Sequence, residues 1–118
     1  MTTQEISSRL HELLVKGDSH TAYKELFAEN AVAIEPKFPG FERVEGLENI
    51  KKKTDGMVSM IEKVNSRTVK EAIVVGSNHI AIGIQMDAVM KGNNPFKVDE
   101  ICLYEVEDGK IVSEQFFY

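Results

Sequence analysis

Cysteine is almost missing from this sequence, since Cys102 is the only one among 118 residues. No internal disulfide can form, so we expect a protein of a reducing compartment, the cytoplasm. No stretch approaches the roughly 18 to 20 consecutive apolar residues that a membrane span needs. The first residues, MTTQEISSRLHELL, also lack the basic segment and long apolar stretch of a signal peptide. These absences favour a soluble cytoplasmic protein without a membrane partner.

A basic stripe is missing as well. The formal net charge is −5, and lysine and arginine are spread along the chain. The tightest basic cluster is residues 51–53, and on a helix three adjacent lysines point in three directions, which predicts a solvated face. A nucleic-acid partner is therefore not expected.

Recognisable cofactor motifs are lacking too. His11, His20 and His79 do not have metal-ligand spacing, and no glycine-rich phosphate loop occurs. We expect no metal and no cofactor. The length and the 42% hydrophobic content suit one domain, residues 1–118, that buries a core of its own.

The first half of the chain reads mainly as helix. Apolar residues recur at helical spacing from Ile6 to Leu14, which predicts a helix over about residues 3–16. Gly17 is suited to end it, and Asp18 to cap a second short helix that includes HTAYKELFAEN. The strand AVAIE and a third helix, over about residues 47–64, are predicted to follow.

The second half reads as four strands joined by short turns. They are predicted at residues 67–76, 79–92, 96–107 and 110–118, and the turns are rich in Gly, Asn and Asp. Helices followed by such a meander predict an α+β domain: a cone in which N-terminal helices pack on a curved, mainly antiparallel sheet. The second strand has no strongly charged face, so we expect a homodimer to cover the outer face of the sheet.

Glu35 is the most informative polar residue. It ends an apolar strand, and alternation places it on the same side as two alanines, Ala31 and Ala33, which leave space beneath it. Pro36 favours extended geometry at the preceding residue. A carboxyl group in an apolar pocket acquires a raised pKa and can exchange protons near neutral pH. The alternatives are a solvated strand end or an ion pair with Arg43.

Several apolar side chains are candidates for the walls of such a pocket. Phe38 and Phe41 lie in the loop that follows Glu35, and the last strand ends in aromatic residues. Methionine thioethers suit an adaptable apolar surface, although most methionines simply fill the core. The predicted ligand-binding residues are Leu10, Tyr23, Phe38, Phe41, Met57, Met60, Phe116 and Tyr118.

Three segments, ELFAENAVAIEP, EGLENIKK and YEVEDGKIVSEQFFY, carry a family resemblance. Their order along nearly the whole chain resembles the nuclear transport factor 2-like superfamily, particularly its SnoaL-like and ketosteroid isomerase members. Ketosteroid isomerase uses an aspartate as general base and an oxyanion hole made of a tyrosine and a protonated aspartate. The resemblance implies that Glu35 is the base and Asp99 the second acid. Alternation groups Asp99 with Ile101 and Leu103, which favours an inward position for it.

One part of that mechanism is missing. The resemblance places Leu10 where the family has its tyrosine, and losing one oxyanion-hole donor costs about 3 to 4 kcal/mol. Steroid isomerisation by the same mechanism is therefore not expected. What is expected is a protein that binds a small apolar molecule and catalyses its isomerisation, cyclisation or dehydration by acid–base chemistry. The alternative is a non-catalytic ligand-binding or dimerisation module of the same fold.

Overall fold

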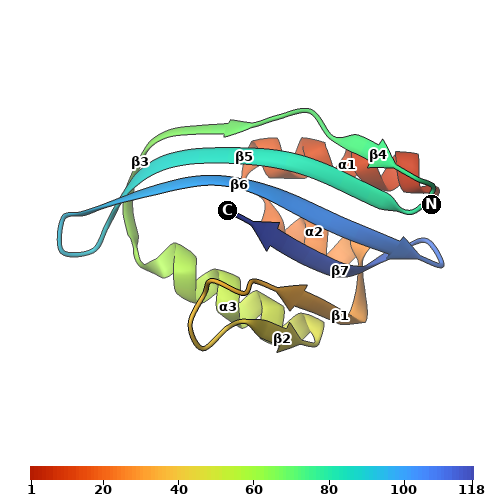
Figure 1. Cartoon of the computed structure of the whole chain (residues 1–118), viewed down its shortest axis with the longest axis horizontal. Helices are drawn as coiled ribbons and strands as arrows, with labels where there is room; N and C mark the ends of the chain where they lie inside the picture. The colour runs from red at the N-terminus through yellow and green to blue at the C-terminus, as the bar shows by residue number, and fades with distance from the viewer.

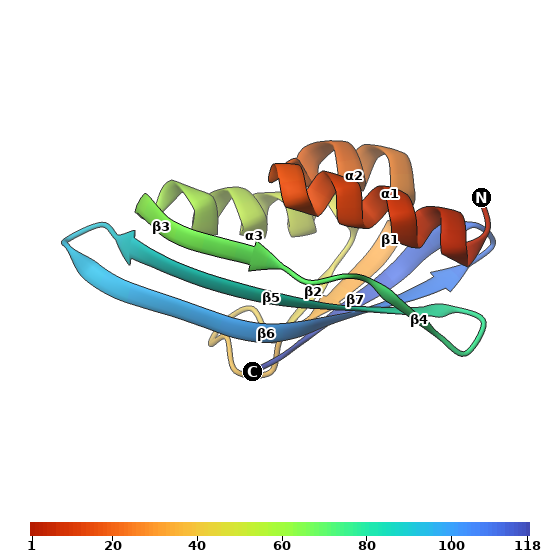
Figure 2. The same cartoon turned by 90° about the horizontal axis from the view of Figure 1, so that it is seen from above.

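The computed structural model describes residues 1–118. Three helices lie against one face of a curved sheet, and the other face carries no helix (Figures 1 and 2). The helices are α1 (Thr3–Lys16), α2 (Ser19–Leu26) and α3 (Leu47–Ser59). The strands are β1 (Phe27–Ile34), β2 (Arg43–Glu45), β3 (Ile61–Val69), β4 (Ile73–Val75), β5 (His79–Met90), β6 (Asn94–Glu107) and β7 (Lys110–Phe117). The predicted α+β fold is confirmed.

The sheet has the strand order β2-β1-β7-β6-β5-β3, and β4 pairs with the remaining part of β5. The pairs β3–β5, β5–β6 and β6–β7 are antiparallel, as the predicted meander requires. β1 is the exception, because it runs parallel to β7. This long-range pair brings the end of β1, where Glu35 follows, beside the end of the chain.

Local signals explain the first two helices. The Thr2 hydroxyl accepts from the Glu5 N–H while the Glu5 carboxylate accepts from the Thr2 N–H, which caps the start of α1. Gly17 ends α1 with φ of 73°, a left-handed conformation that glycine adopts without strain. Asp18 then caps α2 by accepting from the Thr21 N–H at 3.1 Å and its hydroxyl at 2.7 Å.

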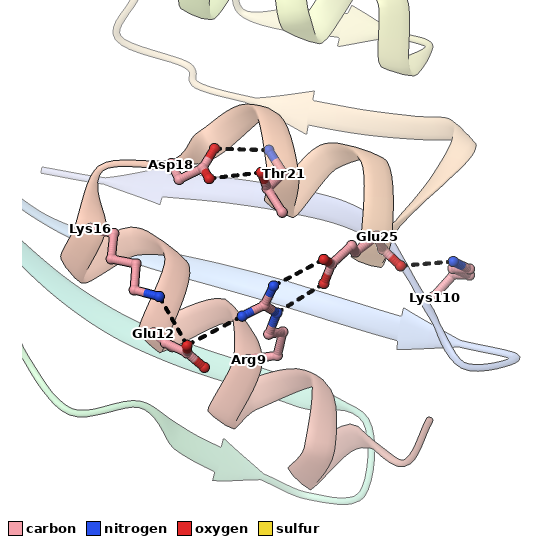
Figure 3. Close-up of polar contacts among 7 residues, drawn as sticks. All are labelled: Arg9, Glu12, Lys16, Asp18, Thr21, Glu25 and Lys110. Atoms are coloured by element: carbon pink, nitrogen blue, oxygen red, sulfur yellow. Dashed lines mark hydrogen bonds and ion pairs between the residues drawn. The ribbon is translucent and has the colours of Figure 1, made fainter.

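Polar contacts on the outer side of the helical layer fix α1 against α2 (Figure 3). Arg9 donates two hydrogen bonds of 2.9 Å to the Glu25 carboxylate and also lies 3.3 Å from Glu12. Lys110, at the start of β7, donates to the Glu25 carbonyl at 2.9 Å. Because these side chains are partly exposed, we expect their contacts to orient α1 relative to α2 but to add little to the free energy of unfolding.

Three predicted boundaries are wrong. α2 ends at Leu26, and Phe27 already begins β1. α3 ends at Ser59, so the residues expected to continue it form the first part of β3. The strand predicted over residues 67–76 is divided between β3 and β4. In β3 the edge of β5 supplies backbone partners for a segment rich in β-branched residues, and this pairing decides the conformation.

The core lies between the helices and the inner face of the sheet. Its buried cluster contains Ile6, Leu10, Leu13, Leu14, Ala22, Tyr23, Leu26, Phe27, Ala31, Ala33, Leu47, Ile50, Ile80, Ile82, Cys102, Tyr104, Val106 and Ile111. The outer face stays open and carries apolar side chains: Ile101 is 53% exposed, and its cross-strand partner Phe117 is 50% exposed. No helix is long and apolar enough to cross a bilayer.

Candidate functional site

Glu35 points inward, as its position in the strand predicts. Ala31 and Ala33 are fully buried on the same side of the chain, and Glu35 is only 7% exposed. The loop fixes its backbone, because the Glu35 N–H donates to the Glu42 carbonyl and the Phe38 N–H donates to the Glu35 carbonyl. The side chain is therefore aimed between the sheet and α3 rather than into water.

The partner of Glu35 is a lysine. Lys53 of α3 places Nζ 2.6 Å from Glu35 Oε1, and the two side chains are 8% and 9% exposed. The expectation that residues 51–53 share a solvated face is therefore wrong for Lys53, because its position on α3 turns it toward the sheet. Arg43, the partner considered from the sequence, instead lies 2.9 Å from Glu45.

The second oxygen of Glu35 is also engaged. The Tyr118 hydroxyl donates to Glu35 Oε2 at 2.8 Å. Burial, with this hydrogen bond, raises the pKa of Tyr118 to about 12, so its hydroxyl keeps its proton at neutral pH. Lys37 donates to the Tyr118 main-chain oxygen at 2.5 Å, which ties the loop to the end of β7. Glu35 is thus held from both sides by hydrogen-bond donors.

These residues line a cavity of about 870 Å³ between the helices and the inner face of the sheet. Six of the predicted ligand-binding residues line it: Leu10, Tyr23, Phe38, Met57, Phe116 and Tyr118. Phe41 and Met60 do not line the cavity, so these two predictions are wrong. Phe41 is 42% exposed and packs on Phe38 with ring centroids 4.9 Å apart. Met60 caps the end of α3 and is 46% exposed.

Asp99 is exposed, contrary to the expected inward position. It lies at the rim of the cavity, where Gln85 Nε2 is 3.4 Å from its carboxylate. The alternation of β6 turns the next residue, Glu100, inward with Cys102 and Tyr104. Burial, then the charge of Glu35, raises the pKa of Glu100.

Glu114 is the acid that sequence reasoning missed. It is 5% exposed, lines the cavity, and has no hydrogen-bond or ion-pair partner in the protein. Its neighbours across the strands are Ala33 of β1 and Tyr104 of β6. Burial raises its pKa to about 7, and the nearby Lys53 charge only partly opposes this. The sequence did contain a signal for this acid, because strand alternation places Glu114 on the same side as Phe116, a predicted ligand-binding residue.

The oxyanion-hole tyrosine of ketosteroid isomerase has no counterpart on α1, where Leu10 is 1% exposed and part of the core. Tyr23 of α2 does line the cavity, but its hydroxyl already forms a hydrogen bond of 2.6 Å with the Thr54 hydroxyl. Nor do three or more His, Cys, Asp and Glu side chains gather as a metal site. The buried ionisable side chains that line this cavity are Tyr23, Glu35, Lys53, Cys102, Tyr104 and Glu114.

Three helices packed on an open, mostly antiparallel sheet define the class of α+β cone folds. The sequence profile of the SnoaL-like domain family matches residues 1–118. The chain belongs to this family. A search among curated proteins finds no match.

Solved structures agree with the family assignment. A protein from Mesorhizobium loti, proposed to be a SnoaL-like polyketide cyclase, is 28% identical with a TM-score of 0.92, and each chain is covered completely. A proposed isomerase from Bacillus subtilis is 22% identical with a TM-score of 0.75, over 98% of this chain and 88% of the other. A proposed SnoaL-like polyketide cyclase from Jannaschia sp. CCS1 is 14% identical with a TM-score of 0.75, over 98% and 83%. The last two show the fold alone.

Proposed function

We propose that this protein binds a small, largely apolar molecule in its cavity and moves a proton within it, so that the molecule is isomerised, cyclised or dehydrated. Glu35 is the proton acceptor in this proposal. Glu114 replaces Asp99 as the proton donor, because Asp99 is exposed whereas Glu114 lies inside. No cofactor is needed for such chemistry.

The observation that carries the proposal is that two buried carboxyl groups in one cavity have opposite surroundings. Glu35 accepts hydrogen bonds from the Lys53 ammonium group and the Tyr118 hydroxyl. Glu114 has no donor beside it, and burial favours its neutral form. Two carboxyl groups with such different partners can divide the roles of base and acid.

A second candidate is a non-catalytic ligand-binding or dimerisation module. It is favoured by the fact that both oxygens of Glu35 already have partners, as in a purely structural ion pair. In this alternative the cavity still binds a ligand, but no proton is transferred.

A turnover screen separates the two functions. Apolar ketones and lactones are incubated with the wild type, Glu35→Gln and Glu42→Gln, the last being an exposed acid in the same loop. We expect a rate loss of about 10² to 10⁴ in Glu35→Gln, as for a missing general base, and no loss in Glu42→Gln. Turnover that Glu35→Gln leaves unchanged would remove Glu35 from the mechanism. Ligand binding without any turnover would support the non-catalytic module.

We also propose that the protein is a cytoplasmic homodimer. The open outer face of the sheet, with Ile101 and Phe117 half exposed, is an apolar surface that a second copy would cover. The single cysteine, Cys102, is buried and free, which suits a reducing compartment.

A further inference from the structure

Glu114 presents an unsatisfied carboxyl group to the cavity. Glu114 is 5% exposed, its side chain lines the cavity, and no protein group donates a hydrogen bond to it. The residues opposite it on the neighbouring strands are Ala33 and Tyr104. A buried polar group without a partner is costly, and such groups mark places where something else binds.

The inner part of the cavity contains more acid than base. Its one lysine, Lys53, is already paired with Glu35. The Glu100 carboxylate accepts one hydrogen bond, from the Cys102 thiol, with 3.7 Å between the sulfur and Oε1. Two carboxyl groups, those of Glu100 and Glu114, are therefore left without a positive partner.

The basic groups near the mouth do not remove this imbalance. Four further basic residues line the cavity but are exposed: Lys37, Lys63, Arg67 and Lys97. The exposed acids Glu62 and Asp99 line it as well. In such exposed positions water screens their charges. The excess of acid remains a property of the inner part.

The aromatic wall suits a cation. Lys53 Nζ lies 4.9 Å from the ring centroid of Phe116 and 5.5 Å from that of Phe38, so these ring faces already stabilise one ammonium group. Tyr23 and Tyr104 add further rings along the same cavity. A second positive group here would meet both ring faces and unpaired carboxyl groups.

We propose that the ligand of this cavity is an apolar molecule with a basic nitrogen, which Glu114 protonates and then holds as an ammonium ion. In this step the proton leaves the Glu114 carboxyl group and the nitrogen lone pair forms the new N–H bond, which leaves carboxylate and ammonium side by side. A negatively charged ligand would instead add to the surplus of acid. The inference rests on the proposed function, because it names the substrate class of the same cavity.

The charge state of Glu114 depends on the groups around it. Those that face it are Lys53 from α3, Glu35 after β1, Tyr23 from α2, and Glu100, Cys102 and Tyr104 from β6. Burial raises the pKa of Glu114 to about 7, and the charges of Glu35 and Glu100 act in the same direction. A permanent cation should consequently bind more tightly as pH rises through 7.

The test compares benzyltrimethylammonium, a permanent cation, with neopentylbenzene, its neutral equivalent of the same shape. Binding is measured by NMR titration at pH 6 and pH 8 with the wild type, Glu114→Gln and Glu105→Gln, a control on the outward-facing side of β6. We expect the cation to bind at least about tenfold more tightly than the neutral probe at pH 8. Its Kd should fall about tenfold from pH 6 to pH 8 as Glu114 ionises. Glu114→Gln should abolish both effects, and Glu105→Gln neither.

The outcomes separate this inference from the function it rests on. Equal or tighter binding of the neutral probe would overturn the basic-nitrogen ligand while leaving an apolar binding cavity in place. A cation preference that persists in Glu114→Gln would also overturn it. Binding of neither probe would overturn both proposals. The pH dependence is measured on the wild type, so the test does not depend on a variant that fails to fold.

Discussion

Lys53 and Glu35 form an ion pair across the cavity, with 2.6 Å between Nζ and Oε1 and less than a tenth of either side chain exposed. The lysine comes from a helix and the glutamate from the end of a strand, 18 residues earlier in the sequence. The pair therefore joins the helical layer to the sheet at the site. Removing one charge from a buried pair leaves the other without compensation.

Replacing Lys53 by methionine should destabilise the protein. Lys53→Met leaves the Glu35 carboxylate buried with only Tyr118 as donor, and we expect the free energy of unfolding at pH 7 to fall by about 3 kcal/mol. Urea unfolding measures this, and Lys52→Met, at an exposed neighbouring position, is the control. The double variant Lys53→Met/Glu35→Gln should regain most of the loss. If Lys53→Met were as stable as the wild type, the ion pair would not hold the two layers together.

Glu114 should make stability depend on pH. Its pKa is about 7 in the folded protein against an ordinary 4.5, so the folded state binds this proton more tightly than the unfolded chain. The contribution of Glu114 to the free energy of unfolding is therefore fully present below pH 4.5 and is lost as the pH rises to about 7. The loss amounts to at most about 3 kcal/mol.

The variant Glu114→Gln lacks this titration. Urea unfolding between pH 4.5 and 8 should show the wild type losing stability relative to Glu114→Gln as pH rises, whereas Glu105→Gln follows the wild type. A difference between wild type and Glu114→Gln that stays constant over this range would mean that Glu114 titrates alike in the folded and unfolded chains.

The open outer face predicts a dimer. Light scattering at micromolar concentration should give a mass of about twice 13.3 kDa. Phe117→Lys places a charge on the apolar surface beside Ile101 and should yield monomers. Val15→Lys, at an exposed apolar position on α1, should remain dimeric. A wild-type mass of one chain would show that the outer face is not covered by a second copy.

The inward direction of Glu35 could be predicted from the sequence, because strand alternation and two small neighbours are local signals. The role of Lys53 could not, since a lysine in a charged run on a helix is usually solvated, and only the packing of α3 on the sheet turns it inward. The parallel pairing of β1 with β7 is likewise a long-range contact without a local signal. It is this pairing that brings Tyr118 to Glu35.

The second acid illustrates a different limit. Alternation separates the two sides of β6 but does not say which side is buried, so the prediction of Asp99 as the inward acid is wrong and Glu100 faces inward. The buried neighbours Cys102 and Tyr104 share the side of Glu100 and would have decided the question. Alternation also predicts that Glu114 lies on the same side of β7 as Phe116, so the prediction of an inward Phe116 already implies an inward Glu114.

The central claim is that the cavity contains a neutral carboxyl group beside an ion pair. Carbon-13 NMR of the glutamate side-chain carboxyl groups tests it directly, with Glu114→Gln used to assign the Glu114 signal. The account predicts a titration midpoint near pH 7 for Glu114. A midpoint at the ordinary glutamate value of 4.5 would contradict it, because Glu114 would then be ionised at neutral pH and could not donate a proton.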